Sequence, residues 1–154
     1  KIYEGDVKME NRYLYKAKRI DDGEWVQGYY VKGSDMYGKE THVIFEHDAI
    51  FYSHGETDGF AEIDPSTICQ CTGLKDKNGK LIWENDICDR KEPYPEIVKM
   101  HNGDWILDYS YSCAKDYGYC YCNLGFYTVE RKEAEVIGNI FDNPELLGGK
   151  VNDD

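Results

Sequence analysis

Two pairs of cysteines carry the side chains best suited to metal chemistry. Each pair, Cys69 with Cys71 and Cys120 with Cys122, has one residue between its members. In a strand this spacing places both thiols of a pair on one face, so two paired strands could offer four sulfur ligands to zinc. Zinc sites, however, usually have about two to four residues between such cysteines. We therefore interpret all six cysteines as reduced side chains that pack as small hydrophobes.

A histidine-containing stretch between residues 42 and 58 could also bind a metal. Its candidate ligands are His42, Glu46, His47, Asp48, His54, Glu56 and Asp58. Their spacing fits no established metal motif, and the stretch is rich in turn-forming residues. We interpret these side chains as solvated loop residues and predict neither a metal nor a cofactor.

An acid–lysine pair raises the hypothesis of a metal-dependent nuclease. Glu130 and Lys132 are separated by one residue. With Asp108 on a neighbouring strand, the two acids would hold the metal and the lysine would stabilise charge. Because strand alternation is expected to point Asp108 outward, we keep the nuclease as an alternative and predict no catalytic residues. The run Asp76–Lys80 similarly suggests a calcium loop, but the acids required at its ends are missing, and a β-turn explains it.

Charge limits the partners that the chain can bind. Its 30 acidic and 18 basic residues give a net charge of -12, which repels phosphate backbones and argues against direct nucleic-acid binding. The basic cluster Lys16, Lys18 and Arg19 is therefore interpreted as a solvated strand face. No run approaches the ~20 apolar residues of a membrane span, so we expect no membrane contact and a cytoplasmic location.

Aromatic residues are the strongest remaining signal. They make up 14% of the chain, which exceeds what a small core requires, and Tyr and Trp are enriched where protein surfaces meet. We predict an interaction surface at Trp25, Tyr29, Trp83, Tyr119 and Tyr121.

The elements that must position these residues are mostly strands. Alternating apolar residues and Gly-containing turns predict strands at 13–20, 24–32, 67–72, 81–83, 87–88, 97–107, 119–122 and 133–141. The stretch 41–52 is expected to form two short strands with a turn at 46–48. Gly28 is expected to mark a bulge or a close backbone approach. Asn143 and Pro144 signal a short helix.

One hairpin can be predicted in register. Asn102-Gly103 favours a type I′ turn, which places His101 opposite Asp104, Met100 opposite Trp105 and Val98 opposite Leu107. Period-two alternation then puts a set of apolar side chains on the core face: Val98, Met100, Trp105, Leu107, Tyr109 and Tyr111.

The predicted fold class is therefore mainly β, a β-rich α+β protein. We expect an N-terminal β subdomain (residues 1–66) and a small antiparallel barrel or sandwich (residues 67–142). A short helix and a loose tail (residues 143–154) would follow.

Three stretches resemble the YopX family of phage and prophage proteins. The first runs from Cys71 to Ile87 and contains Thr72-Gly73-Leu74, Asp76, Gly79 and Trp83-Glu84-Asn85-Asp86; the second is 135–147; the third joins 15–18 with 23–29. Asn85 stands where the family usually has Gly, and Asn tolerates the left-handed conformation that such a turn needs. The resemblance implies a phage or prophage origin, a mainly β fold with few helices, and self-association. It implies no catalytic residues, because the family carries no established activity.

The preferred hypothesis is a non-enzymatic module that forms a homo-oligomer or binds a host or phage protein. One alternative is an acidic mimic that regulates a host nucleic-acid-binding protein through its excess of carboxylates. The other is the metal-dependent nuclease described above.

Overall fold

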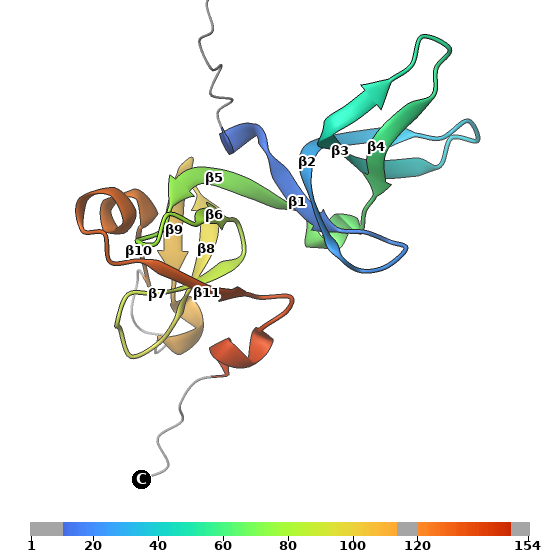
Figure 1. The fold of residues 1–154 in the computed structure, drawn as a ribbon. Helices are drawn as coiled ribbons and strands as arrows, with labels where there is room; N and C mark the ends of the chain where they lie inside the picture. Colours follow the sequence, from blue (N-terminus) through green and yellow to red (C-terminus); the bar gives the residue numbers. More distant parts are fainter. Residues whose placement is uncertain (1–10, 114–119, 149–154) are drawn as a thin grey trace, which may run out of the picture.

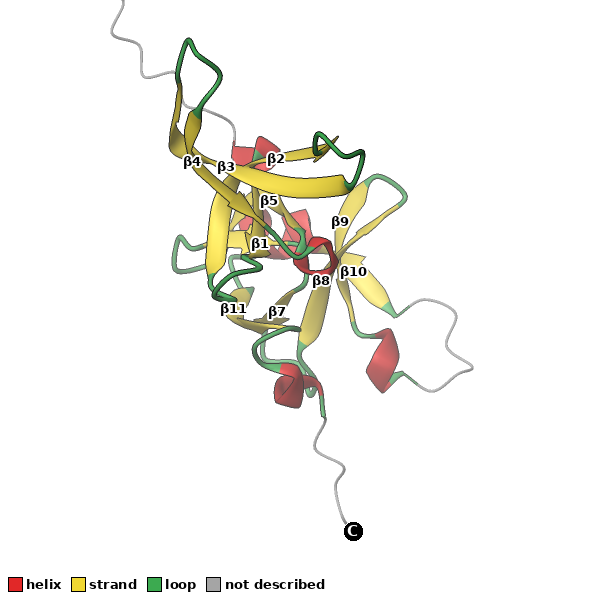
Figure 2. Cartoon of the chain, turned by 90° about the vertical axis from the view of Figure 1, so that its right-hand side faces the viewer, coloured by secondary structure: helices red, strands yellow, loops and turns green. Residues whose placement is uncertain are grey.

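The computed structural model describes residues 11–113 and 120–148 of the chain. The strands are β1 (Tyr15–Lys18), β2 (Trp25–Ser34), β3 (Glu40–Phe51), β4 (Thr57–Glu62), β5 (Cys69–Lys75), β6 (Leu81–Trp83), β7 (Asp86–Asp89), β8 (Glu96–His101), β9 (Asp104–Asp108), β10 (Tyr121–Asn123) and β11 (Glu135–Asn139). The helical segments are η1 (Asn11–Tyr13), η2 (Pro65–Thr67), η3 (Ser110–Ser112), η4 (Phe126–Glu130) and η5 (Pro144–Leu147). The short helices lie before, between and after strands, as Figure 2 shows.

The strands form two open antiparallel sheets (Figure 1). The first has the order β4-β3-β2-β1-β5-β6, and the second has the order β10-β9-β8-β7-β11. The prediction of a mainly β fold is confirmed. The predicted barrel does not form, because the terminal strands of the C-terminal sheet, β10 and β11, do not pair with each other. No helix in the described part of the chain is long and apolar enough to cross a membrane.

Strand β2 changes its partner strand at Gly28. Its first part pairs with β1, ending at Tyr15 opposite Gly28, and its second part pairs with β3 from Tyr29 onward. A Cβ atom on Gly28 would lie 2.0 Å from the backbone oxygen of Phe45. The expected close approach at this glycine is therefore confirmed.

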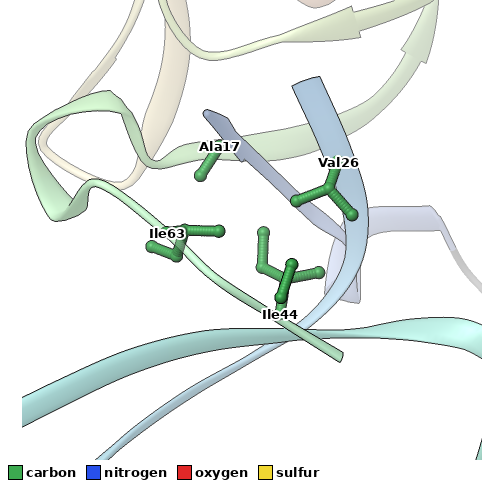
Figure 3. Packing of buried hydrophobic residues seen from close by; sticks show 5 residues of the cluster. Ala17, Val26, Ile44 and Ile63 are labelled. Carbon is green, nitrogen blue, oxygen red and sulfur yellow. The ribbon is translucent and has the colours of Figure 1, made fainter. Parts of the chain in front are cut away.

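The core of the N-terminal sheet is small and aliphatic. It is formed by Ala17, Val26, Ile44, Ala61 and Ile63, and Figure 3 shows the side chains of the cluster converging from separate segments. Across three strands, Tyr30 pairs with Ile44 and Ile44 pairs with Ala61, so this row faces the core. Alternation sends the adjacent row to the opposite face of the sheet.

The stretch predicted as two strands is a single strand, β3, so that prediction was wrong. Strand β3 pairs with β4 up to Phe45 and again from Ile50, and the register shifts between these two residues. A bulge thus absorbs the charged residues without ending the strand. Gly59 permits this, since its φ is +75° and a Cβ there would lie 2.8 Å from the Cα of Ala49. The resulting β3–β4 arm projects away from the second sheet (Figure 1).

The C-terminal hairpin has the predicted register. Val98 pairs with Leu107, and the turn residues Asn102 and Gly103 have φ values of +51° and +90°. Val98 and Leu107 are fully buried, as predicted, in a core completed by Ile82, Cys88 and Leu124.

Three details of the predicted hairpin faces were wrong. Tyr111, predicted to face the core, is 40% exposed in η3. Met100 is exposed, because it lies next to the turn beyond the reach of the core. Asp108, expected to point outward, is buried and forms an ion pair with Lys99. Its carboxylate also accepts a hydrogen bond from the backbone of Ser110, so the charge is neutralised and the side chain need not reach solvent. The C-terminal helix is one short turn, η5, and residues 149–154 lie outside the described part.

Candidate functional site

The two predicted tryptophans lie together at the junction between the sheets. Trp83 is only 6% exposed and packs with Cys69 and Cys71. Trp25 borders the same cluster, and its ring meets that of Phe141 edge-on at 5.8 Å. Trp83 therefore contributes almost no exposed surface, and Trp25 contacts the C-terminal half of its own chain.

Lys16 joins the sheets at this junction. Its Nζ lies 2.9 Å from an Asp86 carboxylate oxygen, and 5.0 and 5.5 Å from the ring centres of Trp25 and Trp83. The ammonium is thus held by an ion pair and by two aromatic faces. The interpretation of Lys16 as part of a solvated face was wrong, because its side chain is only 16% exposed and its ammonium pairs with Asp86 of the second sheet. The junction comprises Lys16, Lys18, Trp25, Cys69, Cys71, Trp83, Asp86, Phe141 and Asp142.

Asp86 is a nearly fully buried carboxylate within this junction. Burial raises its pKa, while Lys16 opposes the shift. The other carboxylate oxygen accepts a hydrogen bond of 2.9 Å from the backbone N–H of Trp83. The group is therefore a structural counter-ion, fixed at the start of β7.

Asp142 closes the outer side of the junction. It forms an ion pair with Lys18 and accepts hydrogen bonds from Asn139 and from the indole N–H of Trp25, the last at 2.6 Å. The bonds from Lys18 and Asn139 lower its pKa to about 2, with a smaller contribution from Trp25.

This lowered pKa predicts an acid-sensitive contribution to stability. A carboxyl group whose pKa is depressed on folding stabilises the protein above its unfolded pKa of about 4 and loses that effect as pH falls. We expect the free energy of unfolding to drop between about pH 4 and pH 2 more steeply in the native chain than in Asp142→Asn. Urea denaturation across this range measures both slopes. Parallel slopes would show that Asp142 does not carry the effect.

The other predicted aromatic residues lie elsewhere. Tyr121 is half-buried on the edge strand β10, with its ring 4.9 Å from that of His101. Tyr119 lies outside the described residues. Tyr29 is half-buried on β2, paired with Phe45 of β3. The predicted set therefore does not form one continuous surface within the described part.

An exposed aromatic face, which the sequence patterns did not predict, surrounds Tyr29. Phe45 pairs with Tyr29 on one side and with Phe60 on the other, so the three side chains form a row on the face opposite the core. Phe51 joins them, with its ring 5.3 Å from that of Phe45. Phe51 is 68% exposed and Phe60 is 46% exposed. We call Tyr29, Phe45, Phe51 and Phe60 the aromatic face.

The cysteines divide into one disulfide and four free thiols, of which Cys122 is only partly buried. Cys113 and Cys120 form a disulfide with Cα atoms 6.4 Å apart, so the expectation of six reduced cysteines was wrong. Because Cys120 is part of this disulfide, it offers no free thiol that could bind zinc together with Cys122. Burial raises the pKa of both Cys69 and Cys122 to about 11, which keeps these thiols neutral and weakly nucleophilic.

The described residues contain no group of three or more His, Cys, Asp or Glu side chains placed to hold a metal ion. His42 bonds to Tyr30 and Glu40, and His54 bonds to Glu56. The carboxylate of Asp108 is already in an ion pair with Lys99.

Three residues of the stretch Cys71–Ile87, which resembles the YopX family, have structural roles. Asp76 accepts backbone hydrogen bonds from Asn78, Lys80 and Val136, which closes its turn and ties it to β11. Asn85 has a φ of +65°, the left-handed conformation expected where the family has Gly. Thr72 donates a hydrogen bond of 2.8 Å to the backbone of β6.

Comparison with known proteins places the chain in a family. A family model described as YopX protein matches residues 14–148. The crystal structure of protein yopX from Bacillus subtilis is similar with 19% sequence identity and a TM-score of 0.49. The match covers 88% of this chain and 98% of that one. Among curated proteins, none matches this chain.

Proposed function

The chain belongs to the YopX protein family, and on this premise we propose that it is a non-enzymatic module that assembles with further copies of itself. The aromatic face carries this proposal. A row of aromatic side chains on the solvent side of a sheet is typical of surfaces that bind proteins.

The position of the face supports a second copy as the partner. The face reaches β4, which is the edge strand of the six-stranded sheet. An edge strand can pair with the same strand of another copy about a twofold axis, because an antiparallel pair is self-complementary. Phe60, on β4, would then lie at the centre of the new contact.

The non-enzymatic part rests on how the reactive side chains are used. The buried acids Asp86 and Asp108 are paired with lysines, and the thiols of Cys69 and Cys122 are neutral at physiological pH. We place the module in the cytoplasm of a bacterial host, with a phage or prophage origin, as part of the same proposal.

Self-association predicts a molar mass that depends on the aromatic face. We expect size-exclusion chromatography with light scattering to give a dimer or larger species, and Phe51→Ser/Phe60→Ser to give a monomer with unchanged circular dichroism. Met36→Ser/Tyr37→Ser is the matched control, because both residues are 87% exposed but lie in the β2–β3 loop. A native chain that stays monomeric at high micromolar concentration rules out the proposal.

A further inference from the structure

A small basic hollow lies beside the C-terminal sheet, away from the aromatic face. Its volume is ≈ 240 Å³, and it is lined by Lys77, Arg90, Lys91, Lys132 and Glu133. Four of these five side chains are positive, in a chain whose acids outnumber its bases by 30 to 18. Such a local reversal of charge focuses a positive potential.

Arg90 is held rigidly at this hollow. Its Nε and Nη2 atoms bond to the buried carboxylate of Glu96 at 2.8 and 2.9 Å, and its guanidinium lies 4.1 Å from the ring centre of Tyr127. The remaining nitrogen, Nη1, bonds to the exposed Glu92 at 2.8 Å. Glu96 and Tyr127 thus fix the plane of the guanidinium, while the weak surface pair with Glu92 can be displaced.

Two of the lysines have no compensating charge. Lys77 is paired with Glu135, and Glu133 is paired with Arg131. Lys91 and Lys132 form no ion pair within the described part of the chain. Once these pairs are counted, the two lysine charges outweigh the single surplus acid, Glu92, which shares Arg90 with Glu96.

The same two lysines adopt a backbone conformation that favours glycine. Lys91 has a φ of +68° and Lys132 a φ of +53°. The other described non-glycine residues with positive φ are both asparagines, Asn85 and Asn102, which tolerate this region better than lysine does. Left-handed lysines therefore cost stability, and such costs concentrate at binding sites.

We infer that this hollow binds the phosphate group of a small ligand. The phosphate would replace Glu92 at Nη1 of Arg90 and contact the ammonium groups of Lys91 and Lys132. An arginine held in one plane and two lysines on long, rotatable stems suit a dianion with several oxygen acceptors. The volume is below the roughly 300–1,000 Å³ of pockets for drug-sized ligands, which favours a phosphate or diphosphate group over a larger molecule.

Titration of the full chain with inorganic pyrophosphate at low ionic strength tests this inference. We expect calorimetry to detect binding that weakens as salt is added. In Lys91→Gly/Lys132→Gly the affinity for pyrophosphate should fall by about tenfold or more, since two charges are lost. Without ligand, this variant should melt about 3 °C higher for each replaced lysine, because glycine relieves the left-handed backbone.

Two further variants separate binding from folding. Glu92→Gln should bind pyrophosphate more tightly, because Nη1 of Arg90 loses its competing acid, and a folding defect cannot imitate this gain. Lys32→Gln/Lys39→Gln removes the same charge from the β2–β3 hairpin and should leave the affinity unchanged. The inference is overturned if pyrophosphate does not bind, or if both lysine pairs have equal effects. Tighter binding of an oligonucleotide than of pyrophosphate would also overturn the assignment to a small ligand.

Discussion

Replacing Gly28 with alanine is expected to lower the free energy of unfolding by ~3 kcal/mol or more, because the added methyl group has no space. The new Cβ would lie 2.0 Å from the oxygen and 2.8 Å from the carbonyl carbon of Phe45, both backbone atoms of β3. Relief would require the two strands to separate at the point where β2 exchanges β1 for β3.

Gly33→Ala is the matched control for this prediction. Gly33 lies in the same strand, but the nearest atom to the place that its added methyl group would take is the Thr41 hydroxyl oxygen, at 3.9 Å. We expect a change within about 0.5 kcal/mol, as for most surface substitutions. Urea denaturation followed by circular dichroism measures both variants, and equal losses would refute the steric argument.

Lys16→Met should cost about 3–5 kcal/mol at neutral pH, because it leaves the buried Asp86 carboxylate without its counter-ion. The cost should shrink in acid. Burial already raises the pKa of Asp86, and loss of Lys16 raises it further, so the variant folds best with Asp86 protonated. Its stability is therefore fully present below the unfolded pKa of about 4 and is lost as pH rises through the higher folded value.

The double variant Lys16→Met/Asp86→Asn separates charge from packing. Asparagine keeps an oxygen that can accept the Trp83 N–H but carries no charge, so we expect it to recover much of the lost stability at neutral pH. Lys32→Met is the control, since Lys32 and Glu40 form an exposed pair worth about 0–1 kcal/mol. A cost for Lys16→Met that is independent of pH would show that Asp86 is not the cause.

Local pattern was sufficient to predict the elements whose determinants are close in sequence. The Asn102-Gly103 turn fixes its own hairpin register, and a glycine within a strand, Gly28, predicts a bulge or a close backbone approach. The bulged strand β3 was missed because the charged residues at 46–48 resemble a turn, while pairing with β4 overrides that preference. The helix η4 was missed because Phe126-Tyr127-Thr128-Val129 has strand-forming residues, although Thr128 donates a hydrogen bond to the backbone of Leu124.

The junction and the aromatic face depend on distant pairs. Lys16 and Asp86 are 70 residues apart, and no periodicity relates them. Composition indicates an excess of aromatic residues. It does not show that Trp83 is buried in the junction while Phe51 and Phe60 are exposed to solvent. Trp83 is buried in the cluster between the two sheets, whereas Phe51 and Phe60 are exposed on the β3–β4 arm, which projects away from the second sheet.

The ion pair between Lys16 and Asp86 also affects how the protein unfolds. If the second sheet unfolded alone, Lys16 would lose its Asp86 partner; if the first sheet unfolded alone, Asp86 would lose both Lys16 and the backbone N–H of Trp83. Partly unfolded species are therefore penalised, and both halves should be lost in a single cooperative transition, so that the chain behaves as one thermodynamic unit.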